Sequence, residues 1–292
     1  MNDLYIRLLC AAGYLVLAPF IGGLLSGLDR KLTARMQGRQ GPPLLQAFYD
    51  VAKLFKKQPV VVNSVQNLLI VGFLVFVAFT GCLFFFGGDL LLIFFALSLA
   101  VIFIFMSASS ANSPYSSMGA QRELVQMLAY EPMILLTAVG FYLFTGSFAV
   151  SDIIRSSTPA IAAMPGVFLG FSFILIIKFQ KSPFDLSTSH HAHQEMVKGL
   201  NTEHAGNILG LIEIAHWYET VFLLCVAGLF FITSDWYSWL IALAVVLLVY
   251  VIDVLVDNTF PRVKWQTMVV MSWAVTLVLG VLNLLILSLI NH

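Results

Sequence analysis

Carboxylates and a histidine stand inside apolar stretches of this 292-residue sequence. In QRELVQMLAYEP, Glu123 and Glu131 are eight residues apart, a little over two helical turns, so they lie near one face of a helix at different depths. In LGLIEIAHWYET, Glu213 and His216 are three residues apart, and Glu219 follows. Carboxyl and imidazole groups withdrawn from water can bind and release protons near neutral pH. This pattern favours a path for protons.

The same groups permit two other interpretations. Ionisable side chains at membrane depth cost roughly 2.5–3.5 kcal/mol each to insert, and the acids could simply pair with Arg122 or Lys198 and hold helices together. Glu213 and His216 are also spaced like metal ligands in helix bundles, but such sites need a second motif and further glutamates. The whole set, including Asp253 of a later stretch, gathers at one end of three helices. We therefore favour proton transfer and expect no metal.

A polar segment, KSPFDLSTSHHAHQEMVKGLNTEHAGN at 181–207, separates two apolar runs. Pro183 fixes its own backbone φ and is expected to bend the chain. The segment also holds three clustered histidines and an acid: His190, His191, His193 and Glu195. Histidine is a common metal ligand, but no cysteine is near and a single acid accompanies the cluster. Proton buffering or contact with another subunit is favoured over a metal site.

Composition places the chain in a membrane. Hydrophobic residues make up 60% of it and charged residues 10%, with a mean hydropathy of +0.92, whereas soluble domains carry about a quarter charged residues. Fifteen Lys and Arg balance fifteen Asp and Glu, which argues against a nucleic-acid partner. Cys10, Cys82 and Cys225 lie far apart in apolar runs, so they predict neither a disulfide framework nor a metal cluster. The first apolar run lacks the features of a signal peptide and is expected to remain as a membrane helix.

Eight apolar stretches have the length of about 20 residues that a helix needs to cross a bilayer. They predict an all-α integral membrane protein, a single membrane domain over 1–292, with helices at about 5–28, 66–86, 90–110, 124–148, 160–180, 209–232, 237–256 and 266–290. Residues 44–57 are too short and too charged to span. Their apolar residues recur at helical spacing, so we expect an amphipathic helix on the membrane surface there.

Basic residues are divided unequally between the predicted loops. Thirteen of the fifteen Lys and Arg fall on the side of the amphipathic helix, against Arg7 and Arg155 on the other. Because positively charged loops stay in the cytoplasm, both termini are expected outside, and the chain is expected in the inner (cytoplasmic) membrane as a multi-pass protein. The segment 181–208 then becomes a cytoplasmic loop suited to coupling the membrane domain to a partner.

Four stretches in order carry a resemblance to a known family. They are LDRKLTARMQGRQGPPLLQAFYDVAKLFKK (28–57), RELVQMLAYEP (122–132), PFDLSTSHHAHQEMVKGLNTEHAGN (183–207) and NTFPRVKWQ (258–266). They resemble the signature stretches of the eight-helix membrane subunit shared by respiratory complex I, where it is called H or 1, and the energy-converting membrane-bound [NiFe] hydrogenases. The resemblance covers essentially the whole chain.

The resemblance implies roles for individual residues. Glu131 matches the glutamate of the family's charged passage from the quinone pocket to the antiporter-like pumps, and Glu195 and Glu203 match glutamates of a later loop. With the groups derived above, the expected proton path comprises Glu123, Glu131, Glu195, Glu203, Glu213, His216, Glu219 and Asp253. The residues expected to form the coupling loop and to dock other subunits are Arg30, Arg39, Asp50, Lys53, Arg122, Asp185, His190, His191, His193 and Arg262.

The chain departs from the complex I pattern at three places. Asp29 replaces the glutamate of the first loop, and Lys178 stands where the complex I pattern places a glutamate shortly before P-F-D. The stretch STSHHAHQ replaces a compact acidic stretch that belongs to the quinone site. SPFDLSTSHHAHQE is similar to the version found in Ech-type energy-converting hydrogenases, which reduce protons with ferredoxin electrons and use no quinone.

The resemblance thus implies a membrane subunit of an energy-converting [NiFe] hydrogenase. It would dock the soluble redox module and couple ferredoxin-dependent proton reduction, or H2 oxidation, to translocation of H⁺ or Na⁺. The chain itself would hold no catalytic residue and no cofactor, with the NiFe centre and iron–sulfur clusters in partner subunits. The implied partners are the hydrogenase large and small subunits, an antiporter-like membrane subunit, and ferredoxin as an indirect electron donor.

Three alternatives stay open at this point. The same subunit could belong to a proton-pumping NADH:quinone oxidoreductase or to a formate hydrogenlyase. A free-standing ion transporter is a different class, but such transporters often show internal repeats and interrupted helices at the membrane centre, and this sequence shows no convincing repeat. A purely structural membrane anchor is the remaining interpretation.

Overall fold

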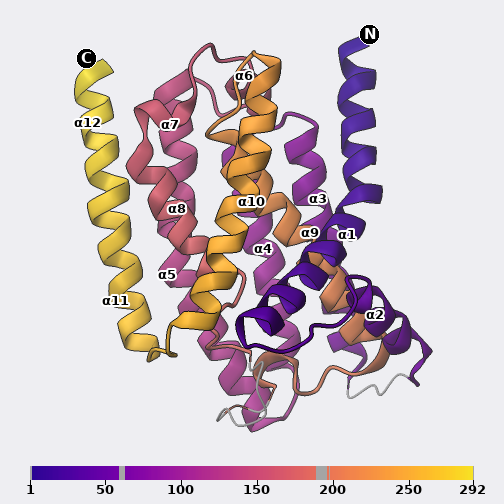
Figure 1. The fold of residues 1–292 in the computed structure, drawn as a ribbon. Coiled ribbons are helices and arrows are strands. Elements are labelled where there is room, and N and C mark those ends of the chain that lie inside the picture. The colour runs from indigo at the N-terminus through magenta and orange to yellow at the C-terminus, as the bar shows by residue number, and fades with distance from the viewer. Residues whose placement is uncertain (1, 59–62, 189–195, 197, 292) are drawn as a thin grey trace.

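The computed structural model describes residues 2–58, 63–188, 196 and 198–291. In this part of the chain the regular structure is helical, apart from one isolated bridge between Asp89 and Ala149. The long helices run side by side in a bundle, and both chain ends lie at the same end of it (Figure 1). The expectation of an all-α membrane protein is confirmed, whereas the assignment of the termini to the outside stays a prediction from charge.

Seven helices of the described chain are long and apolar enough to cross a bilayer. Six of them are continuous: α1 (Asn2–Met36), α3 (Ser64–Phe85), α4 (Leu90–Ser109), α5 (Pro114–Thr145), α9 (Gly206–Leu229) and α10 (Trp236–Thr259). The seventh joins α11 (Trp265–Val275), the π-helix η2 (Thr276–Val281) and α12 (Leu282–Asn291).

The predicted crossing at 160–180 is not one long helix. It is divided into α7 (Ala160–Ala163) and α8 (Pro165–Lys178), preceded by the short α6 (Val150–Ile154). Helix α8 begins with Pro165, whose missing N–H suits the first helical position, after a break in helical geometry at Met164. Its 14 residues span only about 21 Å, short of the roughly 30 Å of a bilayer core. Helix α7 and the chain on the other side of α8 must therefore complete any crossing.

Two helices extend beyond their predicted ends at the end of the bundle opposite the termini. Helix α1 continues to Met36 rather than stopping near 28, so Arg30 lies on a helix and not in a loop. Helix α5 begins at Pro114 instead of about 124. Its first turns are polar, but Gly119 packs directly on the 3-10 helix η1 (Gly199–Asn201): a Cβ there would lie 2.3 Å from Leu200 N. This packing extends the helix past the apolar run that predicted it.

Local sequence sets several helix ends. The side chain of Asn63 accepts a hydrogen bond from Val65 N at 3.1 Å, and that of Asp89 accepts one from Leu91 N at 2.8 Å. Both are N-caps, which satisfy backbone N–H groups left free in the first helical turn. Helix α5 ends at Gly146, whose φ of 75° is a left-handed conformation that glycine adopts without a steric penalty.

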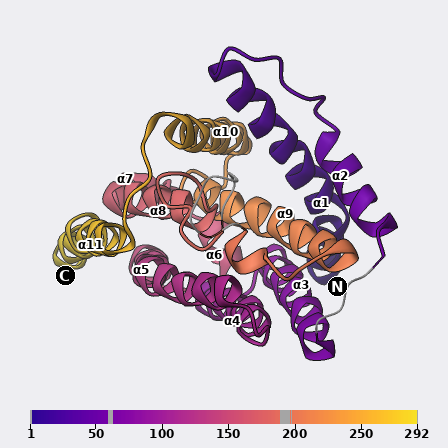
Figure 2. The same ribbon diagram turned by 90° about the horizontal axis from the view of Figure 1, so that it is seen from below.

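Helices α8 and α9 occupy the middle of the bundle. Seen from below, they lie between α1 and α10 on one side and α4 and α5 on the other (Figure 2). Phe141, Phe171 and Phe230 are fully buried together in this centre. The short helix α2 (Gln46–Lys56) lies within the range predicted to be amphipathic and packs its buried Val51 near Trp217 of α9.

Candidate functional site: a polar cavity and a buried ion pair

A polar cavity of about 510 Å³ lies at the end of the bundle that carries α2. Helices α1, α9 and α10 and the segment after α8 form its wall, and its ionisable side chains are Asp29, Arg30, Lys181, Asp185, Glu213, His216, Asp257 and Arg262. Gly22 allows α1 to approach α9 here, because a Cβ on Gly22 would lie 2.6 Å from the backbone oxygen of Trp217. The cavity brings Glu213 and His216 to one surface, as their spacing predicted.

His216 connects this cavity to a buried ion pair. Its Nδ1 lies 3.3 Å from Oε2 of Glu219, three residues further along α9, and Oε1 of Glu219 lies 2.6 Å from Nζ of Lys178 at the end of α8. The Lys178 and Glu219 side chains are only 4% and 6% exposed. Taking two charges out of water costs several kcal/mol per ion, which close mutual contact must offset. Each charge therefore depends on the other.

Helix α5 completes the environment of Lys178. Its Nζ donates a hydrogen bond to the Tyr130 hydroxyl at 3.2 Å and lies 4.8 Å from the centroid of the same ring. The alternative interpretation had named Arg122 and Lys198 as cationic partners for the acids, whereas the partner of buried Glu219 is Lys178. Lys178 and Tyr130 were not among the predicted site residues. The signal that could have found Lys178 was a lysine at the end of an otherwise apolar helix.

The two glutamates of α5 have different surroundings. Glu123 is buried and accepts a hydrogen bond from Gln180 Nε2 at 3.3 Å. Glu131 is half-buried and accepts one from the Ser98 hydroxyl of α4 at 2.7 Å. Glu123 therefore faces the segment after α8, whereas Glu131 faces α4. The prediction that both lie near one face is not confirmed, because the two carboxylates accept hydrogen bonds from different elements.

These groups form a series across the bundle rather than along it. The series starts in the cavity at Glu213 and continues through His216, Glu219, Lys178 and Tyr130. Glu131 is next to Tyr130 in the sequence and leads to α4 on the far side of the bundle (Figure 2). Ionisable groups buried in series are the arrangement that proton transfer requires.

The first part of the polar segment, 181–188, is tied to the end of the bundle. The Gln126 amide donates to Phe184 O at 2.6 Å, and Arg122 donates to Leu186 O at 3.4 Å. From the turn after α10, Arg262 donates to a carboxylate oxygen of Asp185 at 3.0 Å. The predicted docking residue Asp185 is consequently buried and held by Arg262, another predicted docking residue. The expected change of direction is present as a turn at Ser182 and Pro183.

Predicted docking residues near α2 form an exposed ionic cluster. Arg30 of α1 pairs with Asp50 of α2 at 2.5 Å, and Lys53 lies 4.0 Å from the same carboxylate. Partial burial acts to raise the pKa of Asp50, but hydrogen bonds from Arg30 and Gln46 and the two positive charges outweigh it and hold the pKa below its ordinary value. Arg39 donates to the side chain of Gln37 in the turn after α1.

His204 is a buried group that the sequence patterns did not single out. Its Nε2 lies 3.0 Å from the Ser107 hydroxyl and 3.4 Å from the Gln66 amide nitrogen. Burial lowers its pKa from 6.5 to about 4, against weaker opposing effects of a backbone hydrogen bond and nearby Glu203. His204 is therefore neutral at pH 7 and joins α3, α4 and the loop before α9.

Several predicted residues are not brought into the series. Glu203 lies half-buried in the connection before α9 and does not line the cavity. Asp253 is buried on α10, and its Oδ2 has no hydrogen-bond partner among the described residues. His190, His191, His193 and Glu195 lie outside the described residues. Within residues 2–58, 63–188, 196 and 198–291, no group of three or more His, Cys, Asp or Glu is placed to hold a metal ion.

The fold and the buried charges define a multi-pass helical membrane protein with a polar interior at one end. From residue 9 to residue 288 the chain matches the family model described as NADH dehydrogenase. The chain belongs to that family, which includes the membrane protein called H in complex I, and the resemblance found in its motifs is confirmed.

Relatives in the family come from two kinds of complex. The H component of NADH-quinone oxidoreductase from Dehalococcoides mccartyi strain CBDB1 is 27% identical over 98% of this chain and 87% of its own length. Hydrogenase-4 component C of Escherichia coli K12 is 27% identical over 86% of each chain. A chain of the membrane-bound sulfane sulfur reductase, an archaeal respiratory membrane complex, shares the fold with a TM-score of 0.85, at 23% identity over 96% of this chain and 99% of that one.

Proposed function

We propose that this chain is the membrane subunit of an energy-converting complex that couples a redox reaction in a soluble partner to ion translocation. We assign that complex to the [NiFe] hydrogenases. The carrying observation is the continuous series from the polar cavity through His216 and Glu219 to Lys178 and Tyr130. A cavity beneath a docked partner senses that partner's charge, and the series carries the response into the membrane domain.

The physical basis of coupling is the mutual dependence of the buried charges. Lys178 and Glu219 each lack access to water, so a proton gained or lost at His216 changes the interaction energy of the pair directly. No described hydrogen bond joins Tyr130 to Glu131, so a proton moving on to α4 would require water or a side-chain rotation. A redox event that shifts the segment 181–188 would act on the cavity wall through Lys181 and Asp185.

The hydrogenase assignment is supported by the stretch SPFDLSTSHHAHQE (182–195), which resembles the Ech-type version, and by Lys178, which departs from the complex I pattern. A lysine at this position gives Glu219 a fixed counter-charge. In this proposal the chain binds no cofactor. The NiFe centre and iron–sulfur clusters belong to hydrogenase large and small subunits, ferredoxin delivers electrons to them, and an antiporter-like subunit adjoins the membrane domain. The ion moved is H⁺ or Na⁺.

The test begins with the intact complex, purified from its native membrane through a tag on this chain. Nickel, iron–sulfur subunits and ferredoxin-driven H2 production support the assignment, whereas flavin, NADH oxidation and quinone would assign the chain to complex I. A co-purifying formate dehydrogenase would indicate a formate hydrogenlyase. A chain that purifies alone and moves ions in liposomes would contradict the proposal and support a free-standing transporter.

Coupling is then tested with Glu131→Gln in the complex reconstituted into vesicles. We expect H2 production to continue while ion translocation is lost, because the substitution keeps the shape of the side chain and removes its proton exchange. Asp235→Asn is the matched control, since Asp235 is an exposed carboxylate at the opposite end that accepts a hydrogen bond from Tyr237. Translocation by Glu131→Gln equal to that of Asp235→Asn would support the structural anchor instead.

A further inference from the structure

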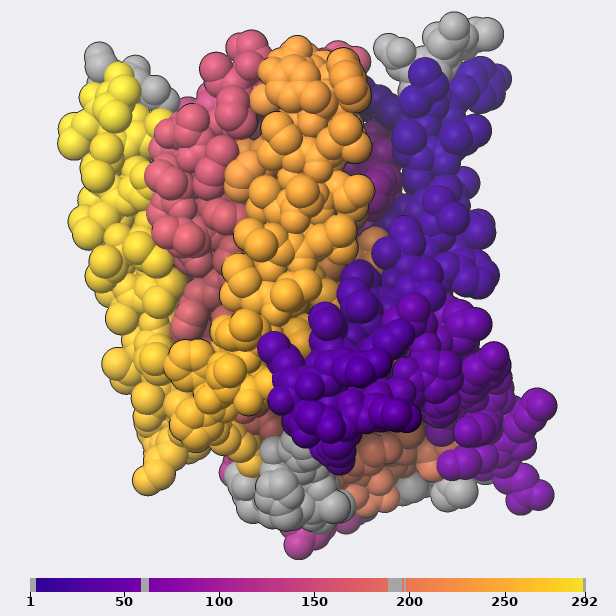
Figure 3. Space-filling view, in the orientation of Figure 1, coloured from indigo at the N-terminus to yellow at the C-terminus, as the bar shows by residue number. Residues whose placement is uncertain are grey.

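Helices α1 and α10 diverge toward the end of the bundle that carries the termini. Near the polar cavity they are joined, because the Tyr250 hydroxyl donates to Leu25 O at 2.9 Å and the Asn258 amide donates to Thr33 at 3.0 Å. Beyond these bonds the two helices separate (Figure 1). A groove opens between them on the molecular surface (Figure 3).

The groove contains a second cavity of about 430 Å³. Helices α3 and α9 form its floor with side chains that include Phe84, Cys225 and Leu229, and Trp239 of α10 forms one side. Most of its lining is apolar, and the exposed flanks of α1 and α10 around it are apolar too. In a bilayer this apolar lining would therefore face hydrocarbon rather than water.

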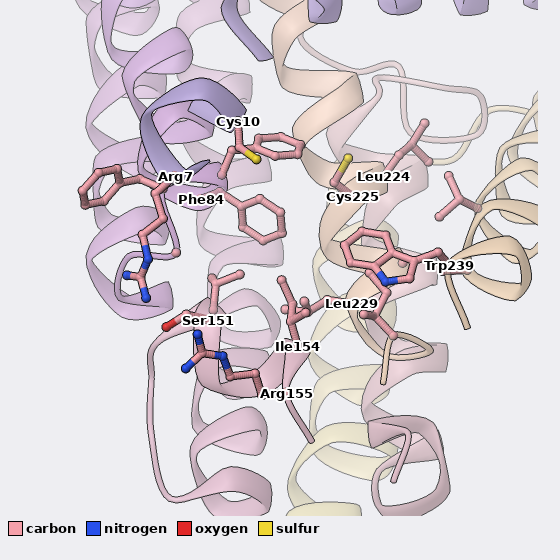
Figure 4. Close-up of a pocket in the computed structure, with 18 of the residues that line it drawn as sticks. Arg7, Cys10, Phe84, Ser151, Ile154, Arg155, Leu224, Cys225, Leu229 and Trp239 are labelled. Carbon is pink, nitrogen blue, oxygen red and sulfur yellow. The ribbon is translucent and has the colours of Figure 1, made fainter. Parts of the chain in front are cut away.

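The polar groups of this cavity gather at one end. Arg7 of α1 and Arg155, which follows α6, place their guanidinium groups there with Ser151 between them (Figure 4). Gly87, in a left-handed turn with φ of 84°, brings the two elements together, since a Cβ on it would lie 3.1 Å from Ser151 Cβ and 3.6 Å from Arg7 Nη1. The structure describes all fifteen Lys and Arg residues. Arg7 and Arg155 are the two that lie at the end of the bundle that carries the termini.

Neither guanidinium forms an ion pair with a described carboxylate. The acid closest in sequence to Arg155 is Asp152, which accepts a hydrogen bond from the Ser147 hydroxyl at 2.7 Å. Asp89, in the turn beside Gly87, is used as the N-cap of α4. Two cations that form no ion pair with any carboxylate whose side chain the structure describes, at the end of an apolar groove, are complementary to a ligand with an anionic head and a hydrocarbon tail.

We propose that the groove between α1 and α10 binds one anionic glycerophospholipid of the leaflet at the terminal side. Its phosphate lies between Arg7 and Arg155, and one acyl chain lies along Phe84, Leu229 and Trp239. Arginine suits this role because its planar fork donates two parallel hydrogen bonds to phosphate oxygens. The lipid would fill the space between two helices that diverge there.

The head group, not the acyl chain, determines which phospholipid the groove binds more tightly. An acyl chain leaves one apolar environment for another, so the hydrophobic effect contributes little to association inside a bilayer. A choline head group would bring a positive charge against the second arginine, whereas a glycerol head group would not. We therefore infer selection of phosphatidylglycerol over phosphatidylcholine. A hydrophobic peptide could fill the apolar part but would leave both cations unpaired.

Native mass spectrometry of the full chain in detergent tests the site with dioleoyl phosphatidylglycerol and dioleoyl phosphatidylcholine as probes. Each arginine near an anionic lipid surface raises the binding affinity by a factor of about five. The double variant Arg7→Gln with Arg155→Gln should therefore weaken phosphatidylglycerol binding about 25-fold. The matched control, Arg35→Gln with Lys57→Gln, removes two cations at the opposite end and should leave this binding unchanged. Equal affinity for the two lipids, or no loss in the arginine variant, would overturn the proposal.

A second measurement keeps the test decisive if the arginine variant does not fold. Phosphatidylglycerol with brominated acyl chains should quench the fluorescence of Trp239, measured as the difference between the native chain and Trp239→Phe. Brominated phosphatidylcholine at the same concentration should quench it less. In native membranes, a cross-linker on the exposed thiol of Cys10, which lines the groove, should capture lipid. Capture of a polypeptide there would overturn the proposal, because the groove would then be a subunit contact.

Discussion

Removing Lys178 tests the central physical claim, the mutual dependence of two buried charges. In Lys178→Met the side chain keeps its length and apolar stem, but Glu219 loses the ammonium group 2.6 Å away and Tyr130 loses a hydrogen-bond donor. Breaking a buried ion pair by removing one partner costs about 3–5 kcal/mol. At 4% and 6% exposure, neither side chain can be rescued by water. We expect a loss of about 3 kcal/mol or more in the free energy of unfolding.

The double variant Lys178→Met with Glu219→Gln provides the discriminating comparison. Replacing both charges by neutral groups of similar shape is often close to neutral, so the double variant should be more stable than either single one. The assay is reversible unfolding of the full chain in mixed micelles, followed by tryptophan fluorescence. Lys57→Met, at an exposed lysine, is the control and should change stability by less than about 0.5 kcal/mol. Additive losses in the double variant would refute the reasoning.

Two further predictions concern groups outside the membrane-spanning helices. Arg30→Gln or Asp50→Asn should change stability by less than about 1 kcal/mol, because this pair is exposed and screened, and a larger loss in the same unfolding assay would contradict an exposed pair. For His204, the unfolded chain binds a proton below pH 6.5 but the folded chain only below about 4, so stability should fall by roughly 3 kcal/mol as pH drops through that window. His204→Gln should remove this part of the pH dependence of stability and leave the rest unchanged. If stability still falls with pH between 6.5 and 4 as steeply as in the native chain, His204 is accessible to protons in the folded state.

Local patterns were enough to predict most of the architecture. Long apolar runs specify membrane helices wherever a backbone must satisfy its own hydrogen bonds in lipid, and α3, α4, α9 and α10 lie close to their expected ranges. The pattern failed where tertiary packing extended a helix, as at the polar start of α5. It also failed where a proline interrupted an apolar run, as at Pro165.

The candidate site was predictable in part. Spacing on one helix placed Glu213 and His216 together, since i and i+3 positions share a face. Spacing along one helix could not predict contacts between helices, because the sequence does not show which turn of α8 faces α9. For that reason the sequence suggested only Arg122 and Lys198 as possible cationic partners for the acids, as an alternative to proton transfer, and Lys178, the actual partner of Glu219, was noted only as a departure from the complex I pattern.

The sequence by itself determined that the chain is an all-helical membrane protein and to which family it belongs. It also determined that the side of the membrane domain with the amphipathic helix is the one rich in basic residues. These properties follow from composition and from short motifs, each of which acts locally. Only the tertiary structure decided that the ionisable groups form a series across the bundle, and that Arg7 and Arg155 meet at one groove. Both arrangements depend on how helices distant in sequence pack, and packing is set by the shapes of whole surfaces rather than by any single stretch.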